Sequence, residues 1–239
     1  MKYLNFPIMK LAQRALLITL FFLFVLVSGA FAQYKSIAMG VKVSPNIGWL
    51  RTDAEDYSSE GAVPGISWGL ITDFYFAENY AFSSGFNVTF HNGKISYPDI
   101  ESFNIGVLNR QYRLKYIDIP MLIKMKTNDI GDFRFFGQIG LQPGVRIGSK
   151  AKDSFKSVTP PSTVKREWRT IDSQTNLFRV AMVVGAGIEY PIDNSTSLVG
   201  GINFVNGLSD VLKGDNEVDS TVEHLAVPNA FEITLGIIF

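Results

Sequence analysis

Very few side chains in this sequence have the chemistry of a catalytic or metal-binding group. His91 and His224 supply the only imidazoles, and there is no cysteine. The lack of thiols excludes disulfides, thiolate metal sites and a cysteine nucleophile, and two imidazoles make a histidine-based metal site a poor fit. An imidazole beside a serine and a carboxylate can hydrolyse lipid, so a lipid-modifying enzyme using His91 stays an alternative. No serine and carboxylate can be assigned to either histidine, and we therefore predict no enzyme, no catalytic residue, no metal and no cofactor.

Overall charge gives no sign of a polyanionic ligand. The sequence has 22 Lys and Arg against 22 Asp and Glu, so its net charge is zero. No overall field marks a nucleic-acid-binding protein, and we predict no nucleic-acid partner. Aromatic residues and glycine are abundant, with 19 Phe, 9 Tyr, 3 Trp and 21 Gly. This composition favours a β-rich protein over a helical one.

Residues 1–32 have the organisation of a secretory signal peptide. A basic start precedes an uninterrupted apolar stretch over 15–27, and an A-x-A cleavage motif ends at Ala32. An uncleaved membrane anchor is the alternative, but a membrane helix needs about 20 apolar residues. We predict a cleaved signal peptide over 1–32 for export through the Sec pathway, followed by one barrel domain over 33–239.

The mature chain alternates between apolar and small or polar residues, which places alternate side chains on opposite faces of a strand. From Ile37 to Trp49 the odd positions are apolar and the even positions are small or polar. The pattern recurs in later segments and is weaker in two of them, 111–126 and 196–208. The other segments are 65–77, 80–91, 133–148, 177–190 and 231–239. Strands of roughly 9–11 residues are long enough to cross a membrane when tilted.

The connections between these segments predict how the strands are arranged. Short turns fall near residues 78–79, 127–131 and 191–194, whereas long polar loops fall roughly over 52–64, 92–110, 149–173 and 209–228. Short turns at one rim and long loops at the other are typical of an outer-membrane barrel with its long loops outside the cell. We predict an all-β, eight-stranded antiparallel up-and-down transmembrane β-barrel in the bacterial outer membrane.

Two other uses of such a barrel stay open as alternatives. A soluble lipocalin would turn its apolar face inward around a ligand, whereas here the second face is mostly Gly, Ser, Asn and Gln, which suits a narrow filled lumen. A small porin-like pore is the other alternative, although an eight-stranded barrel has an interior only wide enough for its own side chains.

Charged side chains on the inward face must find partners, because an isolated buried charge is costly. If a loop over 51–65 closes the first hairpin, Lys42 and Asp73 lie opposite each other and form an ion pair. Arg146, Arg179 and Glu232 fall in the outer half of the lumen and are expected to form a second cluster. We interpret these five residues as a structural polar network, with an ion path or binding site as the alternative.

Aromatic residues gather at both ends of the predicted strands, where interfacial girdles are expected. Trp49 and Trp68 lie near the long-loop rim, and a carbohydrate-stacking platform is an alternative role for these two. The aromatic residues near the short-turn rim are Phe74, Phe76, Tyr80, Phe82, Tyr190 and Phe239.

The long loops differ in charge. The first and last loops are mainly acidic, whereas 149–173 is mainly basic. A basic loop facing acidic ones can hold the rim together or meet the phosphates of lipopolysaccharide. Outer-membrane lipid and lipopolysaccharide are therefore the expected surroundings and partners.

The segment YRLKYIDIPMLIK over residues 112–124 resembles a strand motif of the PorT-like outer-membrane β-barrel proteins of Bacteroidetes. Tyr116, Asp118, Pro120 and Lys124 occupy the motif positions. The resemblance implies an outer-membrane barrel with a structural or partner-binding role and no catalytic residues. Because the family's namesake is tied to type IX secretion and gliding motility, it also implies secretion-machinery proteins as partners.

Overall fold

The computed structural model describes residues 37–193 and 195–239. The predicted signal peptide over 1–32 lies outside the described residues. Within the described part of the chain, no helix is long and apolar enough to cross a membrane.

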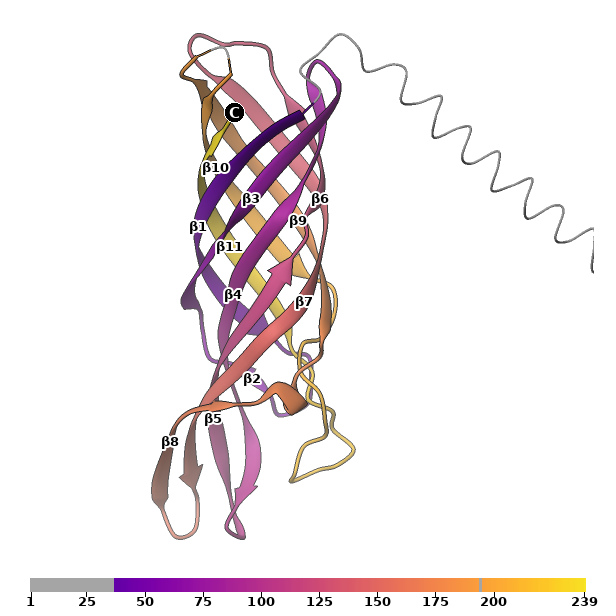
Figure 1. Cartoon of the computed structure of the whole chain (residues 1–239). Coiled ribbons are helices and arrows are strands. Elements are labelled where there is room, and N and C mark those ends of the chain that lie inside the picture. Colours follow the sequence, from indigo (N-terminus) through magenta and orange to yellow (C-terminus); the bar gives the residue numbers. More distant parts are fainter. Residues whose placement is uncertain (1–36, 194) are drawn as a thin grey trace, which may run out of the picture. The chain divides into compact units, whose positions relative to one another are not determined.

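Eight strand positions form a closed antiparallel ring in the described residues (Figure 1). Each strand pairs with its neighbours in the chain, and the first strand pairs with the last, from Gly40 with Ile238 to Arg51 with Val227. The ring consists of β1 (Ile37–Arg51), β3 (Val63–Ala77), β4 (Tyr80–Glu101), β5 (Asn104–Asp118) continued by β6 (Met121–Lys126), β7 (Arg134–Ser157), β9 (Phe178–Pro191), β10 (Ser197–Gly207) and β11 (Val227–Ile238). The remaining elements are β2 (Ser58–Ser59), β8 (Ser162–Thr170) and the short helix η1 (Asp172–Gln174). The predicted eight-stranded barrel is confirmed.

The wall of the barrel is apolar outside and polar inside. On β1, the outward-facing Met39 and Ile47 are 50% and 56% exposed, whereas the inward-facing Ser44 and Asn46 are buried. A lipocalin would show the reverse distribution around a ligand cavity. Large apolar side chains exposed all around a closed ring indicate contact with lipid, where only a closed sheet leaves no backbone group unpaired.

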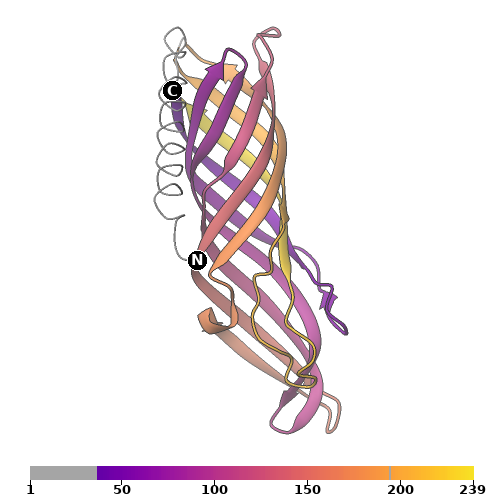
Figure 2. The same cartoon turned by 90° about the vertical axis from the view of Figure 1, so that its right-hand side faces the viewer.

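The predicted loops over 92–110 and 149–173 are wrong. β4 and β5 stay paired as far as Glu101 with Asn104, and a two-residue turn at Ser102 and Phe103, both with positive φ, closes this hairpin. β7 continues to Ser157 and pairs with β8. We call residues 92–101, 104–113, 149–157 and β8 the extended sheet; it projects from the end of the barrel opposite the short turns (Figures 1 and 2).

The extended sheet keeps the alternation of the barrel but reverses its polarity. On β5, the inward-facing Leu108 and Tyr112 are buried, whereas Gln111 and Arg113 face outward and are polar. We predicted loops here because the outward positions are polar. The apolar residues between them were missed because they lie at inward positions, whereas the apolar residues of the barrel lie at outward positions. The extended sheet is therefore a pair of hairpins in water, and its apolar face turns inward.

Two loops cover the inward face of the extended sheet and complete a hydrophobic core. Tyr57 comes from the first loop (52–62), and Leu212 and Ala226 come from the last loop (208–226), which lies beside the extended strands in both views of the chain (Figures 1 and 2). The buried residues of this core are Leu50, Tyr57, Ile95, Tyr97, Leu108, Tyr112, Leu114, Tyr116, Ala151, Phe155, Ile171, Val211, Leu212 and Ala226. Since Leu50 and Leu114 come from different sides of the ring and are fully buried, the core closes this end of the lumen.

Candidate functional site

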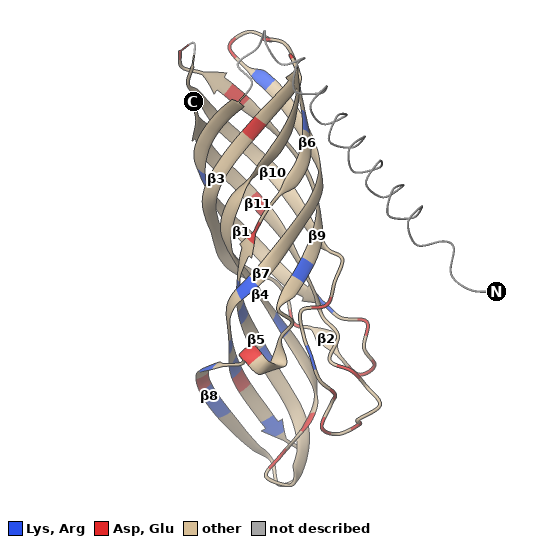
Figure 3. Cartoon of the chain, turned by 45° about the vertical axis from the view of Figure 1, so that its right-hand side comes forward, with Lys and Arg blue, Asp and Glu red and all other residues tan. Residues whose placement is uncertain are grey.

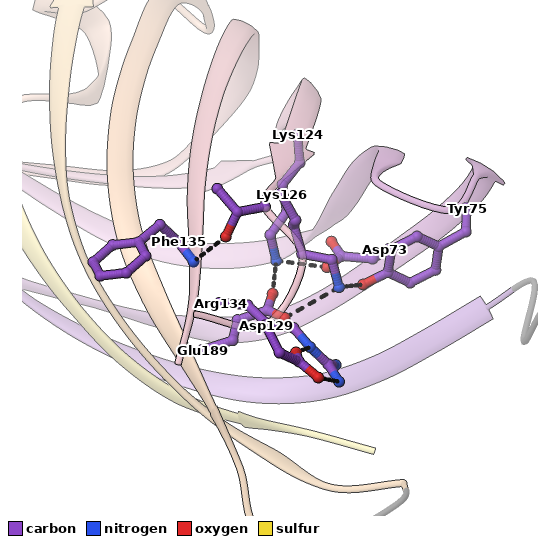
Figure 4. A network of polar contacts seen from close by, with 9 residues as sticks. Asp73, Tyr75, Lys124, Lys126, Asp129, Arg134, Phe135 and Glu189 are labelled. Carbon is purple, nitrogen blue, oxygen red and sulfur yellow. Dashed lines mark hydrogen bonds and ion pairs between the residues drawn. The ribbon is translucent and has the colours of Figure 1, made fainter. Parts of the chain in front are cut away.

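A buried ion cluster fills the lumen near the short turns (Figure 4). Lys124 Nζ donates a hydrogen bond to Asp73 Oδ2 at 2.7 Å and lies 2.6 Å from Glu189 Oε1. Lys126 Nζ lies 3.1 Å from Glu189 Oε2 and also donates to the Tyr75 hydroxyl. Two lysines thus face two carboxylates in a space closed to solvent, where each charge needs the others to offset its desolvation.

The predicted ion pair between Lys42 and Asp73 is wrong. In the register of β1 and β3, Asp73 lies opposite Ala38, and Lys42 lies opposite Gly69. The first hairpin closes earlier in the chain than we expected, and this shift separates the two residues along the sheet. Asp73 instead receives its cation from Lys124 on β6, which is not adjacent to β3. In so narrow a barrel, side chains pair across the lumen as well as between neighbouring strands.

A second buried cluster surrounds Asp118, nearer to the extended sheet than the first cluster. Its carboxylate lies 3.1 Å from His91 Nε2 and 3.3 Å from Arg179 Nε, and it accepts a hydrogen bond from Gln142 Nε2 at 3.1 Å. All four side chains are buried. His91 thus points into the lumen, and the carboxylate beside it is Asp118.

The expected grouping of Arg146, Arg179 and Glu232 is wrong. Arg179 uses Asp118 as its partner, whereas Arg146 bonds to the backbone and hydroxyl oxygens of Thr175. Glu232 is buried, and no cation of the described residues lies within ion-pair distance of it. The inward charges are therefore spread along the lumen rather than gathered in one site.

The motif residues lie at the centre of both lumen clusters. Asp118 and Lys124 are buried, and each forms ion pairs with the other charged residues of its cluster. Tyr116 is also buried, and its hydroxyl donates to the Asn176 carbonyl at 3.0 Å. Pro120 lies in the break between β5 and β6, because it has no N–H to donate to the ladder. Their common parity, opposite to the outward Ile117, was the signal that could have placed these residues in the lumen.

Among the described residues, His91 is paired with a carboxylate, and a small cavity lies in the lumen. Among the described residues, no serine hydroxyl bonds to His91. The hydrogen bond of this histidine goes to Asp118. The described residues also contain no group of three or more His, Cys, Asp or Glu that could hold a metal ion. A cavity of about 40 Å³ lies between the clusters, lined in part by Lys42, Gln138 and Asn203. Such a space holds a few water molecules.

Polar contacts fix the two loops to the inward face of the extended sheet. The Tyr57 hydroxyl lies 2.7 Å from His224 Nδ1 and accepts a hydrogen bond from Asn216 Nδ2 at 2.8 Å. Asn216 also donates to the Pro98 carbonyl at 2.9 Å, and the Tyr57 ring stacks on Tyr97 with ring centres 4.7 Å apart. Burial raises the pKa of Tyr57 to about 12 and lowers the pKa of His224. The site therefore favours a neutral tyrosine and a neutral histidine.

An ion cluster joins β5, β7 and β8 beneath these loops. Arg110 donates two hydrogen bonds to Asp153, at 2.7 and 3.0 Å, and Arg169 donates a third at 2.8 Å. Burial opposes the charge on Asp153, yet the bonds from the two arginines hold the pKa of this carboxyl below its usual value. The extended sheet is thus cross-linked by charge-assisted bonds outside the barrel.

The predicted interfacial aromatics face outward, with the exposed fractions expected of lipid-facing groups. Trp49 packs with Phe204 and Phe231 near the extended end, with ring centres 6.2 and 5.7 Å apart. Trp68 lies opposite Val43 on β1, six residues from Trp49 along that strand, so the two tryptophans do not form one stacking platform. At the other rim, each predicted aromatic residue is at least one-third exposed: Phe74, Phe76, Tyr80, Phe82, Tyr190 and Phe239.

Comparison with known proteins gives a family match and a number of similar solved structures, among them the three that follow. The family described as "Outer membrane protein beta-barrel domain" matches residues 31–213, and no curated protein matches the chain. Neisserial surface protein A is 11% identical, with a TM-score of 0.45, over 85% of this chain and 96% of that chain. OprG from Pseudomonas aeruginosa is 8% identical (TM-score 0.46; 85% and 95% covered), and Ail of Yersinia pestis is 12% identical (TM-score 0.35; 84% and 98% covered).

Proposed function

The chain belongs to the outer membrane protein β-barrel domain family, and from this we propose that it is a non-enzymatic barrel that presents its extended sheet and docked loops to a partner outside the cell. Outer-membrane localisation follows from the family and from the apolar outer wall. The observation that carries the proposal is the inward face of the extended sheet, which orders two loops into a fixed surface. A rigid loop surface limits the entropy lost when a partner binds.

The lumen supports this proposal over the two alternatives. Asp73, Asp118, Lys124, Arg179 and Glu189 pair with one another inside the lumen, and the core around Leu114 closes its extended end. Conduction would require an open path, and catalysis would require a nucleophile beside His91. Neither is present in the described residues.

Removal of the extended β4–β5 hairpin tests the proposal. Replacing residues 94–111 with an Asn-Gly turn would join Gly93 to Tyr112, which already face each other in the ladder. The matched control replaces Glu78 and Asn79 with Asn and Gly in the short turn at the opposite rim. Cross-linking in intact cells, followed by detergent purification and mass spectrometry, should recover partners with the wild type and the control but not with the deletion variant. Recovery of the same partners from all three would contradict the proposal.

A narrower form of the proposal is that the protein is a PorT-like barrel of Bacteroidetes and an accessory of the type IX secretion and gliding machinery. The support is the strand motif, whose Asp118 and Lys124 organise the lumen. Deletion of the gene, followed by comparison of secreted proteins, tests this form. Loss of exported cargo, restored by the wild-type gene, is the expected result, and an unchanged set of secreted proteins would contradict it.

A further inference from the structure

Lysine and arginine recur along the strands of the extended sheet (Figure 3), and seven of them lie at its outward positions. Its cations occupy outward positions of β4, β5, β7 and β8, and we call them the basic face. They are Lys94, Arg113, Lys115, Lys150, Lys152, Lys156 and Lys165. The acids nearest to this face are Glu167, 3.4 Å from Lys152, and Glu60, which accepts a hydrogen bond from Ser96. Apart from Lys152, none of these cations forms an ion pair within the described residues.

The basic face begins where the lipid-facing wall ends. On β5, the outward residues Ile119 and Ile117 are followed by Lys115 and Arg113. On β7, the outward Ile147 is followed by Lys150, which lies opposite Arg113. Two residues of a strand span about 7 Å, so Lys115 lies one such step beyond Ile117, and Arg113 and Lys150 lie within about two steps of the apolar wall. This is the level at which lipid headgroups meet the hydrocarbon.

Aromatic rings hold the first cations in place. The Arg113 guanidinium lies 4.5 Å from the centre of the Trp168 ring, and Lys115 Nζ lies 5.5 Å from the centre of the Phe90 ring. A cation over an aromatic face is positioned without being neutralised. These side chains therefore keep their full charge for an external anion.

The basic face occupies one side of the barrel. On the other side, the corresponding outward positions are aromatic or aliphatic, such as Phe231 and Leu208. The cation near them, Arg51, lies 3.8 Å from Asp53. A ligand attracted by charge would therefore lie along β4, β5 and β7 rather than around the whole rim.

We propose that the basic face binds the phosphate groups of a lipopolysaccharide molecule in the outer leaflet. An amphiphile with phosphates above acyl chains matches the order of this surface, in which Arg113, Lys115 and Lys150 lie directly above an apolar wall that includes Ile117 and Val145. An acidic protein would need the charges but not the apolar wall beneath them. The core that docks the two loops lies on the opposite, inward face, so this inference does not depend on the proposed partner surface.

Lipid A binding by the full chain in detergent micelles tests the inference. Native mass spectrometry would measure the binding of purified bis-phosphorylated lipid A to the wild type and to the variant R113Q/K150Q. The control variant R51Q/K213Q removes the same charge from other extracellular positions. Each basic residue at a membrane surface contributes to the free energy of binding to anionic lipid, and the loss of two such residues should weaken lipid A binding about thirtyfold. The control should bind within about twofold of wild type.

Further measurements separate the possible ligands and check that the variant is folded. Lipid A without phosphates should bind far more weakly to wild type, and inorganic phosphate should not compete, because it lacks the acyl chains. Retention of the heat-dependent electrophoretic shift of a folded barrel would show that R113Q/K150Q is folded. The inference would be overturned if phosphorylated and dephosphorylated lipid A bound equally well, or if R113Q/K150Q and R51Q/K213Q lost the same amount of binding. It would also be overturned if the wild type bound polyglutamate but not lipid A, and R113Q/K150Q weakened the binding of polyglutamate.

Discussion

The barrel wall and the extended sheet are parts of the same strands with opposite polarity. On β5, even-numbered residues face inward throughout. In the barrel the inward Asp118 is charged and the outward Ile117 is apolar, whereas in the extended sheet the inward Leu108 is apolar and the outward Arg113 is charged. The pairing of β5 with β7 continues through both parts, with one β-bulge opposite Lys115 and Tyr116, so the solvent outside each part determines which face is apolar. Hydrocarbon requires apolar side chains on the outside of the barrel, and water requires them on the covered face of the extended sheet.

This difference also determines what fills each interior. The barrel interior holds charged and polar side chains beside two small apolar clusters, and the charged groups must pair with one another because buried charges are costly. The interior of the extended sheet is an apolar core with a few polar contacts to the loops. A substitution in the ion clusters of the lumen should therefore affect the whole barrel, whereas a substitution in the core of the extended sheet should affect the loops alone.

The largest effect is expected from Lys124→Met. The substitution leaves Asp73 without its cation and removes one of two cations from Glu189, which should cost about 3–5 kcal/mol of unfolding free energy. Urea unfolding in lipid vesicles, followed by tryptophan fluorescence, measures this. Lys213→Met, at an exposed position in the last loop, is the control. Adding Asp73→Asn to Lys124→Met should restore part of the stability, and an unchanged midpoint for Lys124→Met would contradict the structural role of the cluster.

Leu108→Ala should destabilise the extended sheet while leaving the barrel intact. Leu108 is 3% exposed, and loss of its side chain from the core should cost about 3 kcal/mol locally. Hydrogen exchange should accelerate in residues 208–226, and the urea midpoint of the barrel should stay at the wild-type value. Val107→Ala, one residue away on the outward face, is the matched control. Faster exchange throughout the barrel strands would show that the two regions are not independent.

The sequence predicted the barrel better than the extended sheet for the same physical reason. A strand with an apolar outer face was recognisable from Ile37 to Trp49, because every outward side chain meets hydrocarbon. In 92–110 the apolar residues are fewer and occupy the opposite phase, so the segment resembled a polar loop. The ion pairs required register and cross-lumen distances, which alternation does not contain. Asp118 and Lys124 were found through the motif, but their partners depended on how the ring closes.

Tyr57→Phe should weaken loop docking without disturbing either core. The substitution keeps the ring that stacks on Tyr97 and removes the hydroxyl that lies between His224 and Asn216. Loss of these bonds should cost about 1–2 kcal/mol of docking free energy. Thermolysin cleavage within the first and last loops should become faster. Tyr80→Phe, on the lipid-facing wall at the other rim, is the control. If Tyr57→Phe and the wild type were cleaved at equal rates, the hydrogen bonds of the Tyr57 hydroxyl would not be what holds the loops.

The smallest expected effect is a pH dependence of the same docking. Burial and the nearby Arg110 lower the pKa of His224 in the folded state, and Asp215 and Glu217 oppose this only in part. A histidine whose folded pKa lies below its unfolded value stabilises the docked state above the unfolded pKa of about 6.5, and this contribution is lost as pH falls through that range. Hydrogen exchange of residues 208–226, corrected for its intrinsic pH dependence, should therefore show weaker protection at pH 5.5 than at pH 7.5. His224→Gln should lose most of this difference, because its side chain does not titrate, whereas the same pH dependence in that variant would assign the effect to the surrounding carboxylates.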